Sequence, residues 1–455
     1  MLPSDSPRTT LRLRPDSTLH LDGDSAAIIV GPNGVLSLTK LRPAVRAALS
    51  RLADGETDFA ELLGAADGDL VGTFALQGLR RRLSQDGLLW LHLAAGGRSL
   101  LTVRQIKWGR PVTAPGKDAE LVLSRFAVLR REGTDLVLES PCAGAEFRLH
   151  EAELLGLVAA PSADGELARA VRALLVEYGF LVAAGSEEEQ LETDQWSPHE
   201  LWFHHRTRMG RPDLPYGGSC WAKERHQPLP LEHPSFGGER IALPVPAAAT
   251  GRLFEMSHGE VLERRASHRA HDGGRPLTLD QLGEFLYRAA RVRDRMSDGT
   301  QELSRRPYPG GGALYELEIY PVVSRVDGLA AGMYHYDPVG HGLELVPAQP
   351  AAVRQLVRMA RYTAVMDESP QVLLVVAARF GRLMWKYQNM GYAVLLKDVG
   401  ALYATFYGVA TALGLAPCAL GGGDAGTFAA ATGLDPLAES SVGEFVLGSL
   451  PQAED

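Results

Sequence analysis

Residues 306–320 read RPYPGGGALYELEIY, and this stretch decides the fold expected for the second half of the chain. Three consecutive glycines lack a Cβ, so the backbone of Gly310, Gly311 and Gly312 can approach a flat ring and donate its amides to the ring edge. The alternating apolar and polar residues that follow predict a β-strand. Taken alone, the stretch also fits an ordinary glycine loop.

A basic segment, ERRASHR at residues 263–269, lies earlier in the chain. The guanidinium groups of Arg264, Arg265 and Arg269 are forked donors that suit a phosphate. The hydroxyl of Ser267 is a further donor on the same stretch. A helix is expected to begin at Thr278, with Asp280 in its first turn. A basic run alone is more often a solvated surface.

A second glycine cluster closes residues 413–424, LGLAPCALGGGD, after an apolar helix pattern that starts near Val394. The amides of Gly421 and Gly422 can form an anion-binding nest. None of the three segments has the Rossmann or Walker spacing, which disfavours a nicotinamide or nucleoside-triphosphate fold. Together they suit the phosphate and the ring system of a flavin.

The three segments resemble the FMN-binding signature of the nitroreductase superfamily: Arg-x-Ser-x-Arg, a Gly-Ala-Leu-Tyr-x-Leu-Glu strand, and Leu-Gly-Leu-x-Pro followed by Gly-Gly. The resemblance covers roughly the last two hundred residues and implies FMN contacts from Arg265, Ser267, Arg269, the 309–312 loop, and Gly421 with Gly422. Two departures stand out. Ala266 replaces an arginine or histidine of many relatives, which Arg264 can offset, and Pro309-Gly310-Gly311-Gly312 replaces the usual Pro-Ser-Ala-Gly.

The Trp385-Lys386-Tyr387 sequence before the long helix resembles the azoline oxidase branch of that superfamily, the SagB/ThcOx type. Members oxidise a peptide thiazoline or oxazoline ring to a thiazole or oxazole. The resemblance implies Lys386 as the base, desolvated and set beside cations so that it can lose its proton, and Tyr387 as a proton relay or ring support. Without the resemblance, a surface lysine and a core tyrosine are the simpler interpretation.

The first half of the chain reads as a diverged duplication, in which strands and short helices lead to a helix that ends at Gly87 or Gly179 before an apolar strand. The expected fold class is α+β, with tandem winged-helix-like domains before a nitroreductase-like FMN domain. Its expected parts are module 1 (1–95), module 2 (96–188), an acidic and then Pro/Gly-rich arm (189–250) and the FMN oxidoreductase domain (251–455). The modules are expected to bind peptide or a partner, and a purely scaffolding role is the alternative.

Composition limits the partners. The formal net charge is −9, whereas nucleic-acid-binding proteins carry an excess of basic residues to contact the phosphates. The polar residues 1–14 predict neither a signal peptide nor a membrane anchor, so a cytoplasmic protein is expected. The three scattered cysteines, Cys142, Cys220 and Cys418, predict structural thiols, and the histidines near His204 lack the companions of a metal site.

The sequence therefore predicts an FMN-dependent azoline dehydrogenase that acts on a precursor peptide, both leader and azoline-bearing core, with oxygen as the acceptor because no second nucleotide motif is present. The resemblance implies a homodimer, and a cyclodehydratase is a candidate partner. Three alternatives stay open: an NAD(P)H-dependent small-molecule nitroreductase, a flavin dehydrogenase acting on another peptide group, and a non-catalytic peptide-binding scaffold.

Overall fold

The computed structural model describes residues 6–32, 34–64, 69–106, 114–160, 163–209, 216–246 and 256–451. The chain forms two compact units, Met1–Pro215 and Tyr216–Asp455. The boundary predicted at 250/251 lies outside the described residues.

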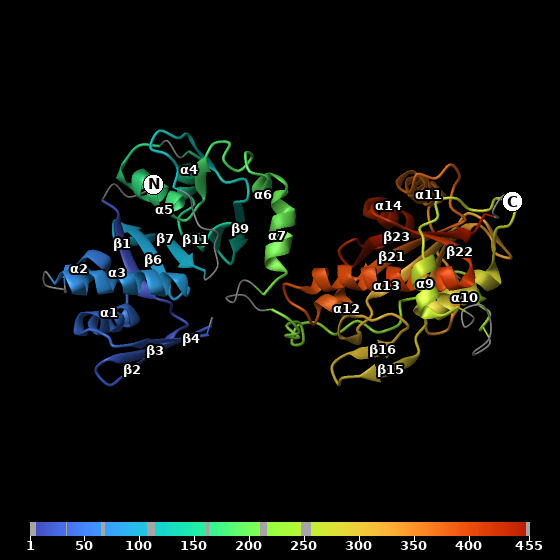
Figure 1. Cartoon of the computed structure of the whole chain (residues 1–455), viewed down its shortest axis with the longest axis horizontal. Coiled ribbons are helices and arrows are strands. Elements are labelled where there is room, and N and C mark those ends of the chain that lie inside the picture. Colours follow the sequence, from blue (N-terminus) through green and yellow to red (C-terminus); the bar gives the residue numbers. More distant parts are fainter. Residues whose placement is uncertain are drawn as a thin grey trace. The chain divides into compact units, whose positions relative to one another are not determined.

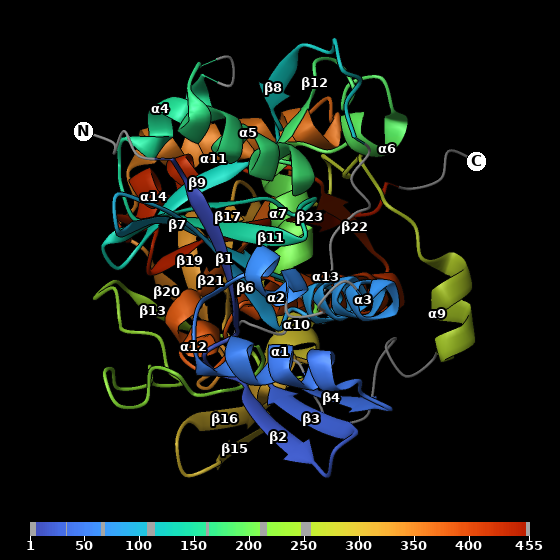
Figure 2. The same cartoon turned by 90° about the vertical axis from the view of Figure 1, so that its left-hand side faces the viewer.

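A seven-stranded antiparallel sheet organises the first unit, in the order β5-β1-β6-β7-β11-β10-β9. One face carries the core leucines, and helices α1, α3, α4 and α5 contribute to the same core. A separate sheet, β2-β3-β4, lies beside α1 (Figures 1 and 2). The elements are β1 (Arg8–Leu13), β2 (Thr18–Asp22), β3 (Ala26–Gly31), β4 (Gly34–Thr39), α1 (Pro43–Asp54), β5 (Thr57–Asp58), α2 (Phe59–Gly64), α3 (Leu70–Gln85), β6 (Leu89–Ala95), β7 (Arg98–Gln105), β8 (Leu121–Leu123), β9 (Val128–Glu132), β10 (Asp135–Glu139), β11 (Ala145–Leu149), α4 (Leu154–Ala159), α5 (Glu166–Glu177), β12 (Leu181–Ala183), α6 (Leu191–Asp194) and α7 (Pro198–Arg206).

The predicted boundary at 95/96 falls in the tight turn of the β6–β7 hairpin, where Gly96 and Gly97 both have positive φ. The two predicted modules thus share one sheet. The expected helix ends are confirmed, because α3 and α5 are each followed by a left-handed glycine, Gly87 and Gly179. A duplication is compatible with a shared sheet, and the winged-helix identity of each copy stays a prediction.

A second seven-stranded antiparallel sheet, β13-β20-β19-β17-β21-β23-β22, forms the centre of the second unit. Alternate residues of β17 and β21 enter two different cores, so helices cover both faces: α10 and α13 on one, α11 and α14 on the other (Figure 1). The elements are β13 (Arg240–Ala242), α9 (His258–Arg264), β14 (Leu277–Thr278), α10 (Leu279–Ala290), β15 (Asp294–Ser297), β16 (Glu302–Arg305), a 3-10 turn (Gly311–Ala313), β17 (Leu317–Val323), β18 (Val326–Asp327), β19 (Gly332–Asp337), β20 (Gly342–Leu345), α11 (Pro350–Ala364), β21 (Val372–Arg379), α12 (Phe380–Met384), α13 (Gly391–Leu413), β22 (Leu415–Leu420), α14 (Ala425–Thr432) and β23 (Glu439–Ser449).

Two helices of this unit follow sequence signals. The helix expected from Thr278 is α10, whose N-terminus is a capping box of Thr278 and Gln281. The apolar pattern near Val394 is the 23-residue helix α13, which ends at the left-handed Gly414. By length and composition α13 is the one helix of the described residues that could cross a membrane, but it packs here against α10, β22 and β23.

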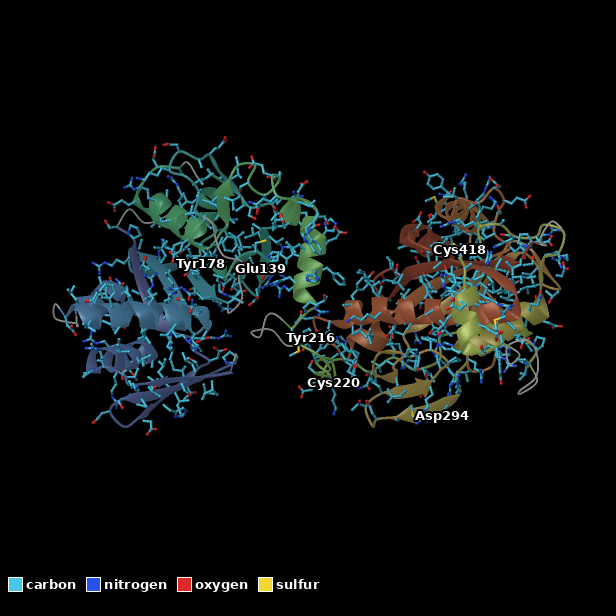
Figure 3. All side chains as sticks on the ribbon, in the orientation of Figure 1. Glu139, Tyr178, Tyr216, Cys220, Asp294 and Cys418 are labelled. Atoms are coloured by element: carbon cyan, nitrogen blue, oxygen red, sulfur yellow. The ribbon has the colours of Figure 1, made fainter. Side chains whose placement is uncertain are left out.

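The predicted arm divides between the two units. The Arg125 guanidinium donates to Asp194, and Arg206 on α7 donates to Glu139, so this acidic end belongs to the first unit. Residues 216–246 instead run along the second unit, where Tyr216 and Cys220 mark their start (Figure 3). This later segment holds part of the candidate site.

Candidate flavin site

The basic segment follows α9 and lies beside β22. The amide of His268 donates to the Pro417 carbonyl, 2.8 Å away. The hydroxyls of Ser267 and Tyr407 are 2.7 Å apart, and Tyr407 also accepts the Ala419 amide at 2.9 Å. The structure therefore brings the first and third sequence segments together, with Tyr407 of α13 as the link.

The three arginines of this segment are exposed, and none forms a salt bridge with another described residue. The Arg265 guanidinium stands over the ring of Tyr407, 5.3 Å from its centroid. Unneutralised guanidinium groups beside a hydroxyl are a donor set that suits a phosphate. Gly421 and Gly422 follow directly after β22, and Asp424 then caps α14 through the Thr427 amide.

The glycine loop lies at the other end of the domain's long helix. The Gly311 amide donates to Asp398 Oδ2 at 2.8 Å. Gly312 has φ 61°, and a β-carbon on it would lie 2.7 Å from the hydroxyl of Tyr387. A β-carbon on Gly311 would lie 2.3 Å from Val394. Glycine is thus required here by the close approach of the chain's own side chains, and the predicted approach of this loop to a flat ring stays a prediction.

Lys386 and Tyr387 follow α12 and are held by the arm. The Cys220 amide donates to the Lys386 carbonyl at 3.0 Å, and Gly217 and Gln388 form a β-bridge. The Trp221 indole donates to the Met384 carbonyl. A β-carbon on Gly218 would contact the side chains of both Lys386 and Tyr387 at 3.6 Å. The arm therefore fixes the backbone of the predicted catalytic pair.

The neighbour of the Lys386 ammonium differs from the expectation. Instead of a cation, Asp298 Oδ2 lies 3.3 Å from Lys386 Nζ, and the two side chains are 30% and 20% exposed. Hydrogen bonds from the Thr300 hydroxyl and the amides of Gln301 and Thr300, with Lys386 itself, hold the pKa of Asp298 well below its usual range. Because this ion pair engages the ammonium group, Lys386 must leave it before the side chain can take a proton from a substrate.

One cavity of about 950 Å³ joins two of the predicted regions. Its walls come from α9 and α13, and it is lined by both Arg265 and Pro309. Tyr403 and Tyr407 line it as well, whereas Gly421, Gly422 and Lys386 do not. The two tyrosines, four residues apart on a mostly apolar helix, are a signal for the site that the sequence interpretation did not use.

Several groups near the loop escaped the sequence interpretation. Asp298 lies in the turn between β15 and β16, a hairpin at the edge of the domain (Figures 1 and 2). Glu316 and Asp398 are buried carboxyl groups beside the loop. A lone aspartate within an apolar helix is the signal that points to Asp398. The described residues hold no group of three or more histidine, cysteine, aspartate or glutamate side chains that could bind a metal.

Comparison with known proteins agrees with this architecture. Residues 121–213 match the family described as cyanobactin oxidase ThcOx, and residues 262–449 match the nitroreductase family. A nitroreductase-type protein of Methanocaldococcus jannaschii is 30% identical over 169 residues, which is 37% of this chain and 80% of that protein. The microcin B17-processing protein McbC of Escherichia coli is 32% identical over 119 residues, or 24% of this chain and 42% of McbC.

The chain belongs to the nitroreductase family of oxidoreductases. Within it, a cyanobactin oxidase ThcOx region stands before the nitroreductase domain, which confirms the resemblance drawn from the sequence. The chain spans less than half the length of McbC.

Two solved structures are also similar to part of the chain. The E. coli microcin synthetase McbBCD complex with truncated pro-MccB17 bound has a chain with 24% identity and a TM-score of 0.37, covering 46% of this chain and 76% of that one. A Bacteroides fragilis nitroreductase with bound FMN has 14% identity and a TM-score of 0.25, covering 45% and 91%.

Proposed function

We propose that this protein is an FMN-dependent dehydrogenase that oxidises thiazoline or oxazoline rings of a precursor peptide to thiazoles or oxazoles. The observation that carries the proposal is the cavity lined by both Arg265 and Pro309, which joins a phosphate-type donor set to the glycine loop. The region matching the ThcOx family and the likeness to a microcin-processing protein support a peptide substrate.

The residues present fit FMN. Arg265, Ser267 and Arg269 offer cationic and hydroxyl donors beside β22, with Arg264 next to them, and Gly421 and Gly422 add amides at the strand end. Pro309 and the loop up to Gly312 would line the ring end. When bound, FMN supplies the hydride acceptor for such an oxidation.

The chain's own residues handle the proton. Loss of a hydride and aromatisation of the ring also require a base that removes the proton from the Cα position. Lys386 is the proposed base once it is released from Asp298, and a bound substrate that draws the hairpin turn or the lysine aside would release it. Tyr387, held against Gly312, would support the ring or pass the proton on.

A homodimer fits the exposed apolar surface of the domain. Leu262 on α9 is 60% exposed beside the cavity, and Tyr392 and Leu396 of α13 are each 40% exposed. A second copy could cover this surface and complete the walls of the cavity. Oxygen is proposed as the electron acceptor, and the first unit is proposed to bind the peptide leader or a cyclodehydratase.

Mass spectrometry tests the function directly. Protein reconstituted with FMN and given an azoline-bearing peptide in air should remove two hydrogens, about two mass units, for each ring. Lys386→Ala should keep the flavin but lose most of this oxidation, whereas Lys223→Ala, at an exposed lysine of the arm, should retain it. NADPH consumption without any peptide mass change would favour a small-molecule reductase, and no reaction of either kind would favour a scaffold.

A further inference from the structure

The carboxyl group of Glu316 is buried beside a second carboxyl group, that of Asp398. It stands directly before β17, is 0% exposed, and neither carboxylate oxygen has a hydrogen-bond partner among the described residues. An ionised carboxylate in such a place is strongly disfavoured, so buried carboxylates normally pair or take up a proton. Glu316 therefore needs a proton or an unseen partner.

The acidic group that acts on Glu316 is Asp398 of α13, which is 8% exposed and accepts the Gly311 amide. Burial raises the pKa of Glu316, and repulsion by Asp398 raises it further. Burial likewise raises the pKa of Asp398. The cation facing Glu316 is Arg306, which is 6% exposed and has two nitrogens without hydrogen-bond partners.

Other groups around the pair do not neutralise it. The Tyr308 hydroxyl is buried and has no hydrogen-bond partner. Lys397 is exposed on α13 and acts only on Asp398. Among the described residues Arg306 forms no salt bridge with Glu316, and its one hydrogen bond goes to the Leu317 carbonyl at 3.4 Å. The cluster is therefore better described as one protonated and one ionised carboxyl group than as two carboxylates.

We propose that Glu316 and Asp398 hold one proton between them, so that neutral Glu316 donates to the Asp398 carboxylate while Asp398 accepts the Gly311 amide. This chain of hydrogen bonds would fix the glycine loop against α13. It makes Glu316 and Asp398 positioning residues for the loop, and through Gly312 for Tyr387. The inference concerns the apoprotein and gives the loop of the proposed active site its support.

Thermal unfolding of the apoprotein against pH tests the shared proton. The ordinary pKa of a glutamate is about 4.3, and the folded state raises it, so the folded state binds more protons than the unfolded state above that pH. Stability should then fall as pH rises from about 5 to about 9. Glu316→Gln keeps a neutral donor and Glu316→Leu removes titration altogether, so both should lose this part of the pH dependence.

The control is Glu239→Gln, at an exposed glutamate of the same domain, which should leave the wild-type pH dependence intact. Hydrogen exchange of the 309–315 segment at pH about 9 gives a second readout, because Glu316→Gln should protect it more strongly than the wild type. A melting-temperature difference between wild type and both Glu316 variants that stays constant across this pH range would overturn the proposal. So would a Glu316→Gln protein that is less stable than wild type at every pH, which would assign Glu316 to an ion pair with Arg306.

These measurements require neither flavin nor substrate. A negative result for the shared proton therefore does not affect the proposed oxidation. A negative result for the oxidation likewise does not affect the proposed shared proton.

Discussion

Replacing Gly312 by alanine adds one methyl group, which should both destabilise the fold and displace the side chain of Tyr387. Gly312 has φ 61°, and the new β-carbon would lie 2.7 Å from the Tyr387 hydroxyl and 3.5 Å from its ring. Left-handed backbone costs a residue with a β-carbon about 1–2 kcal/mol. The short contact adds a second consequence, because the Tyr387 side chain must move by several tenths of an ångström or more.

Gly433→Ala is the matched control. Gly433 has φ 73°, follows α14, and a β-carbon there would meet nothing within 4 Å. Both variants should therefore lose about 1–2 kcal/mol of unfolding free energy, which lowers Tm by roughly 2–8 °C in a unit of this size. Only Gly312→Ala displaces Tyr387.

The assay compares calorimetry with turnover of an azoline-bearing peptide by the FMN-loaded protein. A misplacement of about 1 Å in a catalytic site can cost about 100-fold in rate, so Gly312→Ala should lose between 10-fold and 100-fold of its turnover. Gly433→Ala should keep its rate at a temperature where it is folded. Equal turnover of the two variants, or a Gly312→Ala protein as stable as the wild type, would refute the placement of Tyr387 over the loop.

Three further predictions concern the site and its support. Arg265→Ala should weaken FMN binding by about 10-fold to 100-fold but leave riboflavin binding unchanged, because riboflavin lacks the phosphate. Flavin fluorescence titration measures both affinities, and equal losses for the two ligands would show that Arg265 does not contact the phosphate. Asp298→Asn should raise turnover, since Lys386 is then no longer held in the ion pair and can act as the base; unchanged turnover would show that the ion pair does not restrain the base. Burial lowers the pKa of His271 to about 4 from 6.5, so the folded state disfavours its protonation and stability should be lost as pH falls through this interval. The loss should reach about 3 kcal/mol in urea unfolding and disappear in His271→Asn, and an identical pH dependence in that variant would contradict it.

Local signals in the sequence located much of this fold. The capping box at Thr278, the glycines after α3 and α5, and the alternation in β17 each lie within a few residues of the feature they predict. The same holds for the glycine loop, because a positive φ and a close contact both select for the absence of a β-carbon.

These local signals could not predict which residues far apart in the sequence contact one another. Nothing near Lys386 in the chain indicates that Asp298 lies beside it, or that the segment around Cys220 pairs with it. The partner of a charged group is set by tertiary packing, and a single sequence carries no record of which distant residue arrives. The shared sheet of the first unit was missed for the same reason, since the pairing of β6 with β7 joins residues on opposite sides of the predicted boundary.

That sheet also determines where the chain can be cut. Truncation at residue 95 would keep β6 but remove β7, which pairs with it from Trp90 to Ala95. The fragment would carry a long apolar strand whose amides and carbonyls point into solvent, and such an edge recruits other chains. A soluble fragment of the first unit must therefore retain both halves of the hairpin, so the smallest portable piece is larger than either repeat.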